Sequence, residues 1–408
     1  MTLFAERNPE SAAMNSRLTR SCVALLLGGL STFLLASCST SDGPGAEFAP
    51  RILHQVAARS EPQPGGSSAS GQSIQGALLQ GTDIWVDMPG HLYSTSASGT
   101  PADITPPSWP ALGFNRPYPS PNSNGTLWET VATDTGSVLA ASSENGGADW
   151  NITTVITGLS PAVGLSSTIS YVNSQLAWVS VLSGHVGVSA QSSIYETTDG
   201  GSNWTAEGGL QEMGPAIFGS PSTGLAVSVD QGNAVDVTAN GGQTWTKETL
   251  PVPSGYSSTG GSLELPQFIT PDEAFVPASF VNPDASTPAI FVIDSTTDGG
   301  TSWSQVEMPQ GAFAFAAITP TSWVAVGTNG SQSTFVAQTV NAGQTWTEAN
   351  TNLSLEGIRD LQFVSPEVGI GLWTGWECPS SGPTSCPPTS SLLRTGDGGS
   401  TWTVIPLP

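Results

Sequence analysis

Charged side chains are scarce in this sequence, and positive ones are the scarcest. Asp, Glu, Lys and Arg make up 10% of the 408 residues, against about 25% in an average soluble domain. Helical proteins place many such residues on their exposed faces, so the composition argues against a helix-rich fold. Only 9 Lys and Arg accompany 32 Asp and Glu, a net charge of −23. So few cations exclude nucleic-acid binding and a basic patch for anionic lipid headgroups.

Glycine, proline and tryptophan are abundant instead. The chain has 47 Gly and 32 Pro, while 38% of its residues are hydrophobic and 13 are Trp. This combination is typical of a turn-rich protein with a packed core rather than of a disordered chain. The length permits two or three average domains or one large all-β domain.

The N-terminal region predicts export. Arg17 and Arg20 precede an apolar run over residues 23–35, which is too short to span a bilayer. The run ends in Leu-Ala-Ser-Cys at Cys38, which resembles the bacterial lipobox, in which the Cys is lipidated and becomes the mature N-terminus. The alternative is an ordinary signal peptide with a chance Cys.

We therefore expect a signal peptide over residues 1–37, with Met14 as the start, and a lipidated flexible linker over residues 38–73, rich in Ser, Gly, Pro and Ala. The expected location is the outer side of the cytoplasmic membrane or the outer membrane, with the acyl anchor in the lipid bilayer. In an exported protein, Cys378 and Cys386 predict a local disulfide, because the segment between them can turn back on itself. The three His are scattered, so we predict no metal and no cofactor.

A repeated turn motif dominates the rest of the chain. The pattern Ser/Thr-x-Asp/Asn-x-Gly-x-x-Trp occurs six times, with the Asp or Asn at Asn145, Asp199, Asn240, Asp298, Asn341 and Asp397. Asp and Asn accept backbone N–H bonds of their own loop, and Gly supplies a positive φ. We interpret the motif as a hairpin turn; six ligand or metal sites are the weaker alternative.

Short strand-like segments alternate with these motifs. Their apolar anchors recur at intervals of 43 to 50 residues and are Trp85, Trp128, Trp178, Leu225, Phe275, Trp323 and Ile370. A unit of about 48 residues with alternating strands and Gly-rich turns suits a four-stranded blade. Seven anchors against six motifs indicate that the first unit has lost its motif.

The motifs resemble the Asp boxes, or BNR repeats, of sialidases, sortilin-type receptors and photosystem II assembly factors. This resemblance covers residues 74–408 and implies an all-β, seven-bladed β-propeller of four-stranded antiparallel blades. It places each box between the third and fourth strands of a blade, so that all boxes lie on one face. The number of blades and the segment Pro-Thr-Ser-Trp-Val-Ala-Val-Gly match the assembly-factor group best. That group carries a basic patch, which this chain lacks.

Two long insertions interrupt the repeat, at residues 106–121 and 374–389, and are expected on the face opposite the boxes. They contain or adjoin the three Trp that serve neither boxes nor anchors. We predict a ligand-binding or interface patch there, made of Trp109, Arg116, Tyr118, Trp373, Trp376 and Glu377. The alternative is that these aromatic side chains plug the channel mouth or pack the insertions.

The resemblance to sialidases raises the question of catalysis. That family clamps its substrate carboxylate with three arginines, and this region offers only Arg116, Arg359 and Arg394. No Tyr follows Tyr256, although the family's nucleophilic Tyr comes late in the chain. We therefore predict a monomeric, non-catalytic binding or assembly module for a glycan or envelope protein. A sialidase-like exo-glycosidase is the alternative, and a glycosidase with paired carboxylates stays open.

The charge balance also suggests a hypothesis about environment. With so few Lys and Arg, protonation of the carboxylates leaves little positive charge to drive acid unfolding. Tolerance of acidic surroundings is one interpretation, and an ordinary acidic exported protein is the other.

Overall fold

The computed structural model describes residues 74–96, 100–109, 117–119, 126–160, 165–183, 191–211, 213–228, 232–284, 287–329, 333–376 and 388–408. All of them belong to the second of two compact units of the chain, residues 56–408. The predicted signal peptide, Cys38, the linker and both Cys378 and Cys386 lie outside the described residues. Within these ranges, no helix is long and apolar enough to cross a membrane.

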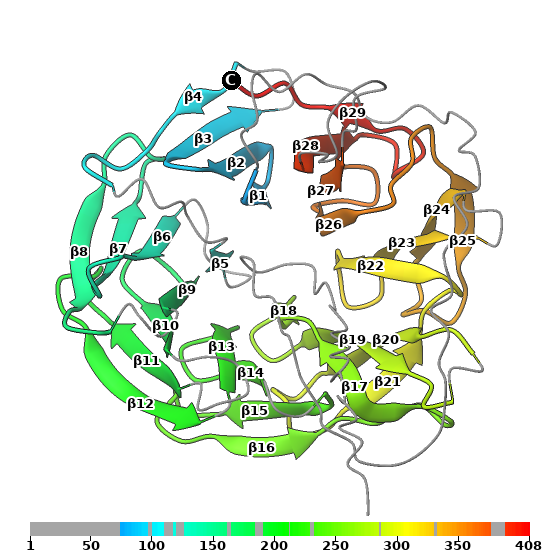
Figure 1. Ribbon diagram of the computed structural model, residues 1–408, viewed down its shortest axis with the longest axis horizontal. Helices are drawn as coiled ribbons and strands as arrows, with labels where there is room; N and C mark the ends of the chain where they lie inside the picture. Colours follow the sequence, from blue (N-terminus) through cyan, green and yellow to red (C-terminus); the bar gives the residue numbers. More distant parts are fainter. Residues whose placement is uncertain are drawn as a thin grey trace, which may run out of the picture. The chain divides into compact units, whose positions relative to one another are not determined.

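The unit is a seven-bladed β-propeller, which confirms the fold predicted from the repeat (Figure 1). Blade 1 contains β1 (Gly76–Gln80), β2 (Asp83–Met88), β3 (His91–Ser96) and β4 (Ala102–Asp103). Blade 2 contains β6 (Leu127–Ala132), β7 (Val138–Ser143) and β8 (Asn151–Ile156). Blade 3 contains β9 (Leu165–Tyr171), β10 (Ala177–Ser183), β11 (Gln191–Thr197) and β12 (Thr205–Gln211).

Blades 4 and 5 contain β13 (Met213–Phe218), β14 (Gly224–Ser228), β15 (Ala234–Thr238) and β16 (Thr246–Thr249), then β17 (Ser257–Leu263), β18 (Gln267–Phe268), β19 (Ala274–Val281), β20 (Ile290–Thr296) and β21 (Ser304–Glu307). Blades 6 and 7 contain β22 (Ala312–Ala317), β23 (Trp323–Thr328), β24 (Thr334–Thr339) and β25 (Thr347–Asn350), then β26 (Ile358–Phe363), β27 (Gly369–Trp376), β28 (Pro388–Thr395) and β29 (Thr403–Val404).

Blade 2 differs from its neighbours. Only β6, β7 and β8 form its sheet in the part of the chain that is described. The short strand β5 (Tyr118–Pro119) comes just before this blade in the sequence, but it pairs in parallel with β9 of blade 3. Pro119 has no N–H to donate, which limits how far such a pairing extends. Among the described residues, the insertion at residues 106–121 thus adds a strand to the sheet of blade 3.

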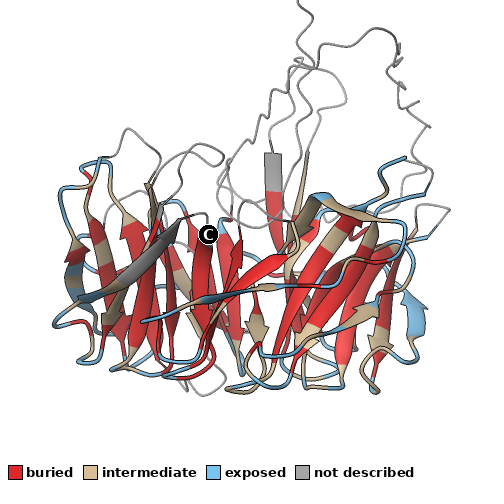
Figure 2. Ribbon diagram, turned by 90° about the horizontal axis from the view of Figure 1, so that it is seen from below, coloured by how far each residue is buried: buried red, intermediate tan, exposed pale blue. Residues whose placement is uncertain are grey.

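The core lies in the seams between blades. Each of the seven seams has its own cluster of buried apolar side chains, contributed by the two blades that flank it. Figure 2 shows the buried residues along the strands and the exposed ones mainly at the turns. All seven predicted anchors are buried, and Trp128, Trp178 and Trp323 are among the largest fully buried side chains. The repeat thus corresponds to one core layer per seam.

The ring closes without exchange of strands between blades 7 and 1 in the described sheets. Side chains of blade 7 instead bond to the backbone of β1 and of Ile74, which precedes it. The Gln362 amide donates to the Ala77 carbonyl oxygen at 2.7 Å and accepts from the Leu79 N–H at 3.0 Å. The Ser390 hydroxyl accepts from the Ile74 N–H at 2.6 Å. A buried apolar cluster shared by both blades completes the seam.

Candidate functional site

The six box turns share one hydrogen-bond pattern. In the last of them, Oδ1 of Asp397 accepts the Thr401 N–H at 2.8 Å and the Thr395 hydroxyl at 3.0 Å. The Thr395 hydroxyl in turn accepts the N–H of Gly399 at 2.8 Å. The same contacts recur in the other five boxes. The Asp or Asn side chain thus holds the turn from inside.

The other terminal side-chain atom of each box Asp or Asn also forms a hydrogen bond. The carboxylate oxygens accept one, and the amide nitrogens donate one. The carboxylates Asp199, Asp298 and Asp397 accept from the side chains of Asn203, Ser302 and Thr401. The amides Asn145, Asn240 and Asn341 donate to the side chains of Asp149, Thr244 and Thr345. Side-chain and backbone hydrogen bonds lower the pKa of the three carboxylates. Among the described residues, no group of three possible metal ligands occurs.

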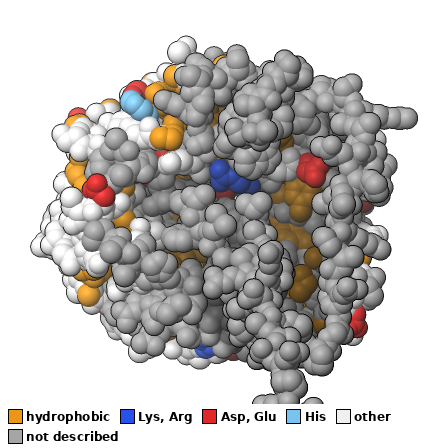
Figure 3. Space-filling view, in the orientation of Figure 1, with side chains coloured by type: hydrophobic (Ala, Val, Ile, Leu, Met, Phe, Trp, Pro, Cys, Tyr) orange, Lys and Arg blue, Asp and Glu red, His pale blue; other side chains and the backbone are white. Residues whose placement is uncertain are grey.

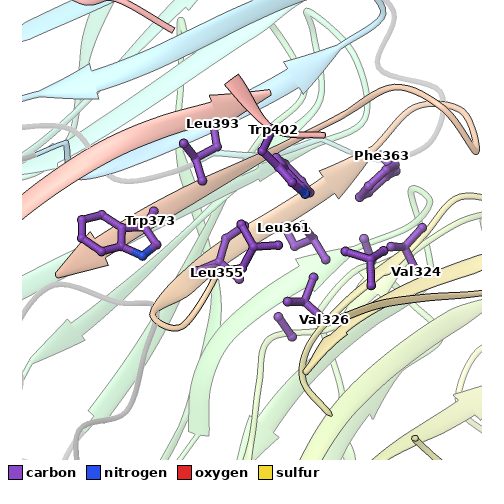
Figure 4. Close-up of a cluster of buried hydrophobic side chains, with 12 residues drawn as sticks. Val324, Val326, Leu355, Leu361, Phe363, Trp373, Leu393 and Trp402 are labelled. Atoms are coloured by element: carbon purple, nitrogen blue, oxygen red, sulfur yellow. The ribbon is translucent and has the colours of Figure 1, made fainter. Parts of the chain in front are cut away.

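Two of the six residues of the predicted binding patch, Trp109 and Trp373, are buried. Trp109 is 9% exposed and packs in the seam between blades 1 and 2. Trp373 is 5% exposed and packs between blades 6 and 7, beside Leu393 and Leu355 (Figure 4). Both indoles are core side chains, because the strands around them turn large apolar surfaces toward the seams. For Trp109 and Trp373, the alternative that the aromatic side chains serve packing therefore holds.

The other members of the patch are only partly described. Tyr118 is half-buried in β5, and Trp376 ends β27, where its backbone pairs with Pro388. The Trp376 side chain, Arg116 and Glu377 lie outside the described residues. On the face that Figure 3 shows, the described charged side chains are few and scattered.

The two described arginines occupy different parts of blade 7. Arg359, on β26, donates to the Ile74 carbonyl oxygen and to the Asp360 carboxylate, each at 3.3 Å. Its side chain is 25% exposed. Arg394 lies on β28, two strands away and next to a box turn. Strand spacing separates the two backbones by about 10 Å across the sheet. Arg359 is thus part of the ring closure.

Two buried carboxyls have strongly raised pKa values, and sequence reasoning did not single them out. Glu129 on β6 is 2% exposed, and Asp294 on β20 is fully buried. Burial raises the pKa of Glu129 well above its usual range, and the nearby Asp87 raises it further. Burial raises the pKa of Asp294 to about 7, against a smaller opposing effect of the Gln305 hydrogen bond. A charged residue inside an apolar strand was the available signal for Glu129.

No protein-family description and no curated protein sequence matches the chain. Solved structures do resemble it. YCF48 bound to a D1 peptide is 18% identical over 80% of this chain and 92% of the other, with a TM-score of 0.48. The GH74 xyloglucanase of Xanthomonas campestris is 11% identical over 82% and 67%, with a TM-score of 0.47. A Hadza microbial sialidase is 12% identical over 69% and 66%, with a TM-score of 0.38. Likeness at this level concerns the fold alone.

Proposed function

We propose that this propeller is a non-catalytic binding or assembly module, anchored to the membrane outside the cytoplasm. The observation that carries the proposal is the position of Arg359, which bonds to the Ile74 carbonyl oxygen and to Asp360. A sialidase-like site needs several guanidinium groups directed at one substrate carboxylate. Arg359 instead supports the seam between blades 7 and 1, and Arg394 lies two strands away.

The face opposite the box turns is the proposed binding surface. Each box joins the last two strands of its blade, so the turn that precedes these two strands lies at the other end of the sheet. These turns and the connection between blades 1 and 2 carry the long departures from the repeat. A rigid ring with variable loops on one side is a common arrangement for recognition. A glycan or an envelope protein is the proposed partner.

The described carboxyls offer little support for the alternative of a glycosidase with paired carboxylates. A glycosidase needs two carboxyl groups on either side of an accessible glycosidic bond. Asp87 and Glu129 do come together, but they are 5% and 2% exposed. A sugar therefore has no access to them in this conformation.

A binding screen combined with an activity assay tests the proposal. The chain from residue 38 onward is applied to a glycan array and to a fluorogenic sialoside, and is crosslinked to its neighbours on intact cells. We expect no turnover, and binding that is lost in Trp376→Ala. Val340→Ser serves as the control, because Val340 is 76% exposed and lies in a box turn on the other face. Sialoside turnover that disappears in Arg116→Ala would overturn the proposal.

The anchor has a separate test. Cys38→Ala is expected to release the protein from the membrane fraction, because a single changed residue removes the acyl attachment site. Cys22→Ala is the matched control, since Cys22 lies within the proposed signal peptide. Membrane association that survives Cys38→Ala would contradict lipidation at this residue.

A further inference from the structure

Two buried carboxyl side chains meet in the seam between blades 1 and 2. Glu129 lies on β6, two residues from Leu127 and two from Val131, so the three side chains share one face of the strand. Both neighbours belong to the apolar cluster that joins blade 2 to Trp85 of blade 1. Glu129 therefore points into this seam, among apolar side chains.

Asp87 reaches the same layer from blade 1. It follows Trp85 by two residues on β2, so the two side chains share a face. It also pairs with Leu92 across β2 and β3, and Leu92 belongs to the same apolar cluster. Asp87 is 5% exposed and Glu129 is 2% exposed. Two acidic groups thus occupy one apolar layer.

The surroundings of Glu129 disfavour its charged form. Its Oε2 atom is buried and has no hydrogen-bond partner among the described residues. The titratable groups that face it there are Asp87 from β2 and Tyr171 from β9. The Tyr171 hydroxyl donates to the Thr126 carbonyl oxygen at 3.0 Å. A negative neighbour and an apolar layer both favour the protonated carboxyl.

We propose that Asp87 and Glu129 form a buried acid pair that holds one proton and makes the seam between blades 1 and 2 a pH-sensitive lock. With the proton on Glu129, the apolar layer around it is undisturbed and the seam stays closed. Release of that proton to solvent leaves a charged Glu129 in an apolar layer, where its Oε2 has no hydrogen-bond partner among the described residues, and this charge draws in water. The seam then loosens.

Hydrogen exchange over a pH series on the full chain tests the lock. Protection factors correct for the pH dependence of intrinsic exchange. We expect the amides of β2 and β6 to lose protection as the pH rises from mildly acidic to alkaline, by roughly tenfold for each pH unit above the ionisation of the pair. Glu129→Gln resembles the protonated acid and should keep its protection throughout. Glu348→Gln, on the exposed strand β25, should behave like the unaltered chain.

Two further measurements keep the proposal falsifiable if Glu129→Gln folds poorly. Asp87→Asn removes the neighbouring charge and should move the loss of protection to higher pH. Infrared difference spectra at neutral pH should show a protonated carboxyl that Glu129→Gln removes. No such band, or protection of β2 and β6 that does not change with pH, would overturn the proposal. So would stabilisation that follows the concentration of Na⁺, K⁺ or Ca²⁺, because a cation would then occupy the site.

Discussion

At the scale of single residues, one box position shows how strongly backbone conformation constrains the sequence. The residue before the box Gly has φ between 69° and 73° in five boxes, where it is always Gly: Gly146, Gly200, Gly241, Gly299 and Gly398. In the sixth box the same position is Ala342, with φ of 53°. A Cβ makes this left-handed conformation unfavourable by about 1–2 kcal/mol. The blade 6 turn is therefore strained.

Ala342→Gly is expected to stabilise the protein. Relief of strain exceeds the loss of about 0.4–1 kcal/mol from the greater freedom of Gly in the unfolded chain, so the net gain is on the order of 0.5–1 kcal/mol. Chemical denaturation measures it. Gly146→Ala is the matched reverse change, because a Cβ there meets no atom within 4 Å and tests φ alone. An unchanged or lower stability in Ala342→Gly would contradict the strain.

Asp294 is a second residue whose surroundings decide its behaviour. It is fully buried, Oδ1 accepts from the Gln305 amide at 3.0 Å, and Oδ2 has no hydrogen-bond partner among the described residues. Burial raises its pKa from 3.8, the ordinary value for Asp, to about 7 in the folded protein. The folded state thus binds this proton more tightly. The stabilisation is complete below about pH 4 and is lost as the pH rises through about 7.

Asp294→Asn is therefore expected to stabilise the protein above neutral pH and to have little effect near pH 4. A difference of about three pKa units corresponds to at most about 4 kcal/mol, reduced by the cost of burying an amide N–H₂. Unfolding free energies at the two pH values measure the difference. Asp134→Asn, at an exposed turn, is the control. An equal effect of Asp294→Asn at both pH values would contradict an ionisable buried carboxyl.

At the scale of elements, side chains of blade 7 bridge the seam between blades 7 and 1, where the described sheets share no strand. The Gln362 amide bonds to two backbone groups of β1, as a neighbouring strand would. It lies just after an irregularity in the pairing of β26 with β27, where Asp360 has φ of 51°. The bulge re-aims the strand, which allows the Gln362 amide to reach β1.

Gln362→Ala is expected to destabilise this seam by about 1–3 kcal/mol, because it leaves backbone groups of β1 without partners. The loss should be local at first, with faster hydrogen exchange at the amide of Leu79 than at blades 3 and 4. Gln344→Ala, at an exposed box position, should leave exchange unchanged. Uniformly faster exchange across all blades would show that the seam is not a separate weak point.

At the scale of the whole molecule, two sets of carboxyls act in opposite pH ranges. Buried Glu129 and Asp294 have a raised pKa, so they stabilise the fold in acid and lose this effect as the pH rises. The box carboxylates Asp199, Asp298 and Asp397 have a lowered pKa, so their contribution is lost only as the pH falls through that lower value. Between the two ranges both sets are favourable.

We therefore expect the thermal midpoint to be highest between about pH 4 and 5 and to fall toward pH 8. The small number of Lys and Arg adds to this, because little positive charge accumulates when carboxylates are protonated. Calorimetry across pH 3 to 8 checks the profile, with the double variant Glu129→Gln and Asp294→Asn as the comparison. A midpoint that rises steadily from pH 5 to 8 would contradict it, as would acid unfolding near pH 3 or above.

The sequence by itself determined the number of blades, the seven buried anchors and the chemistry of the box turns. Each blade comes from one contiguous stretch of chain, and the Ser or Thr, the Asp or Asn and the Gly of each box bond to one another within the turn, so local spacing is sufficient. The tertiary structure decided which side chains share a seam. The burial of Trp109 and Trp373, the pairing of β5 with β9, the reach of Gln362 and the meeting of Asp87 with Glu129 depend on how blades adjoin. Contacts between blades join residues far apart in the chain, and no repeat pattern within one blade encodes them.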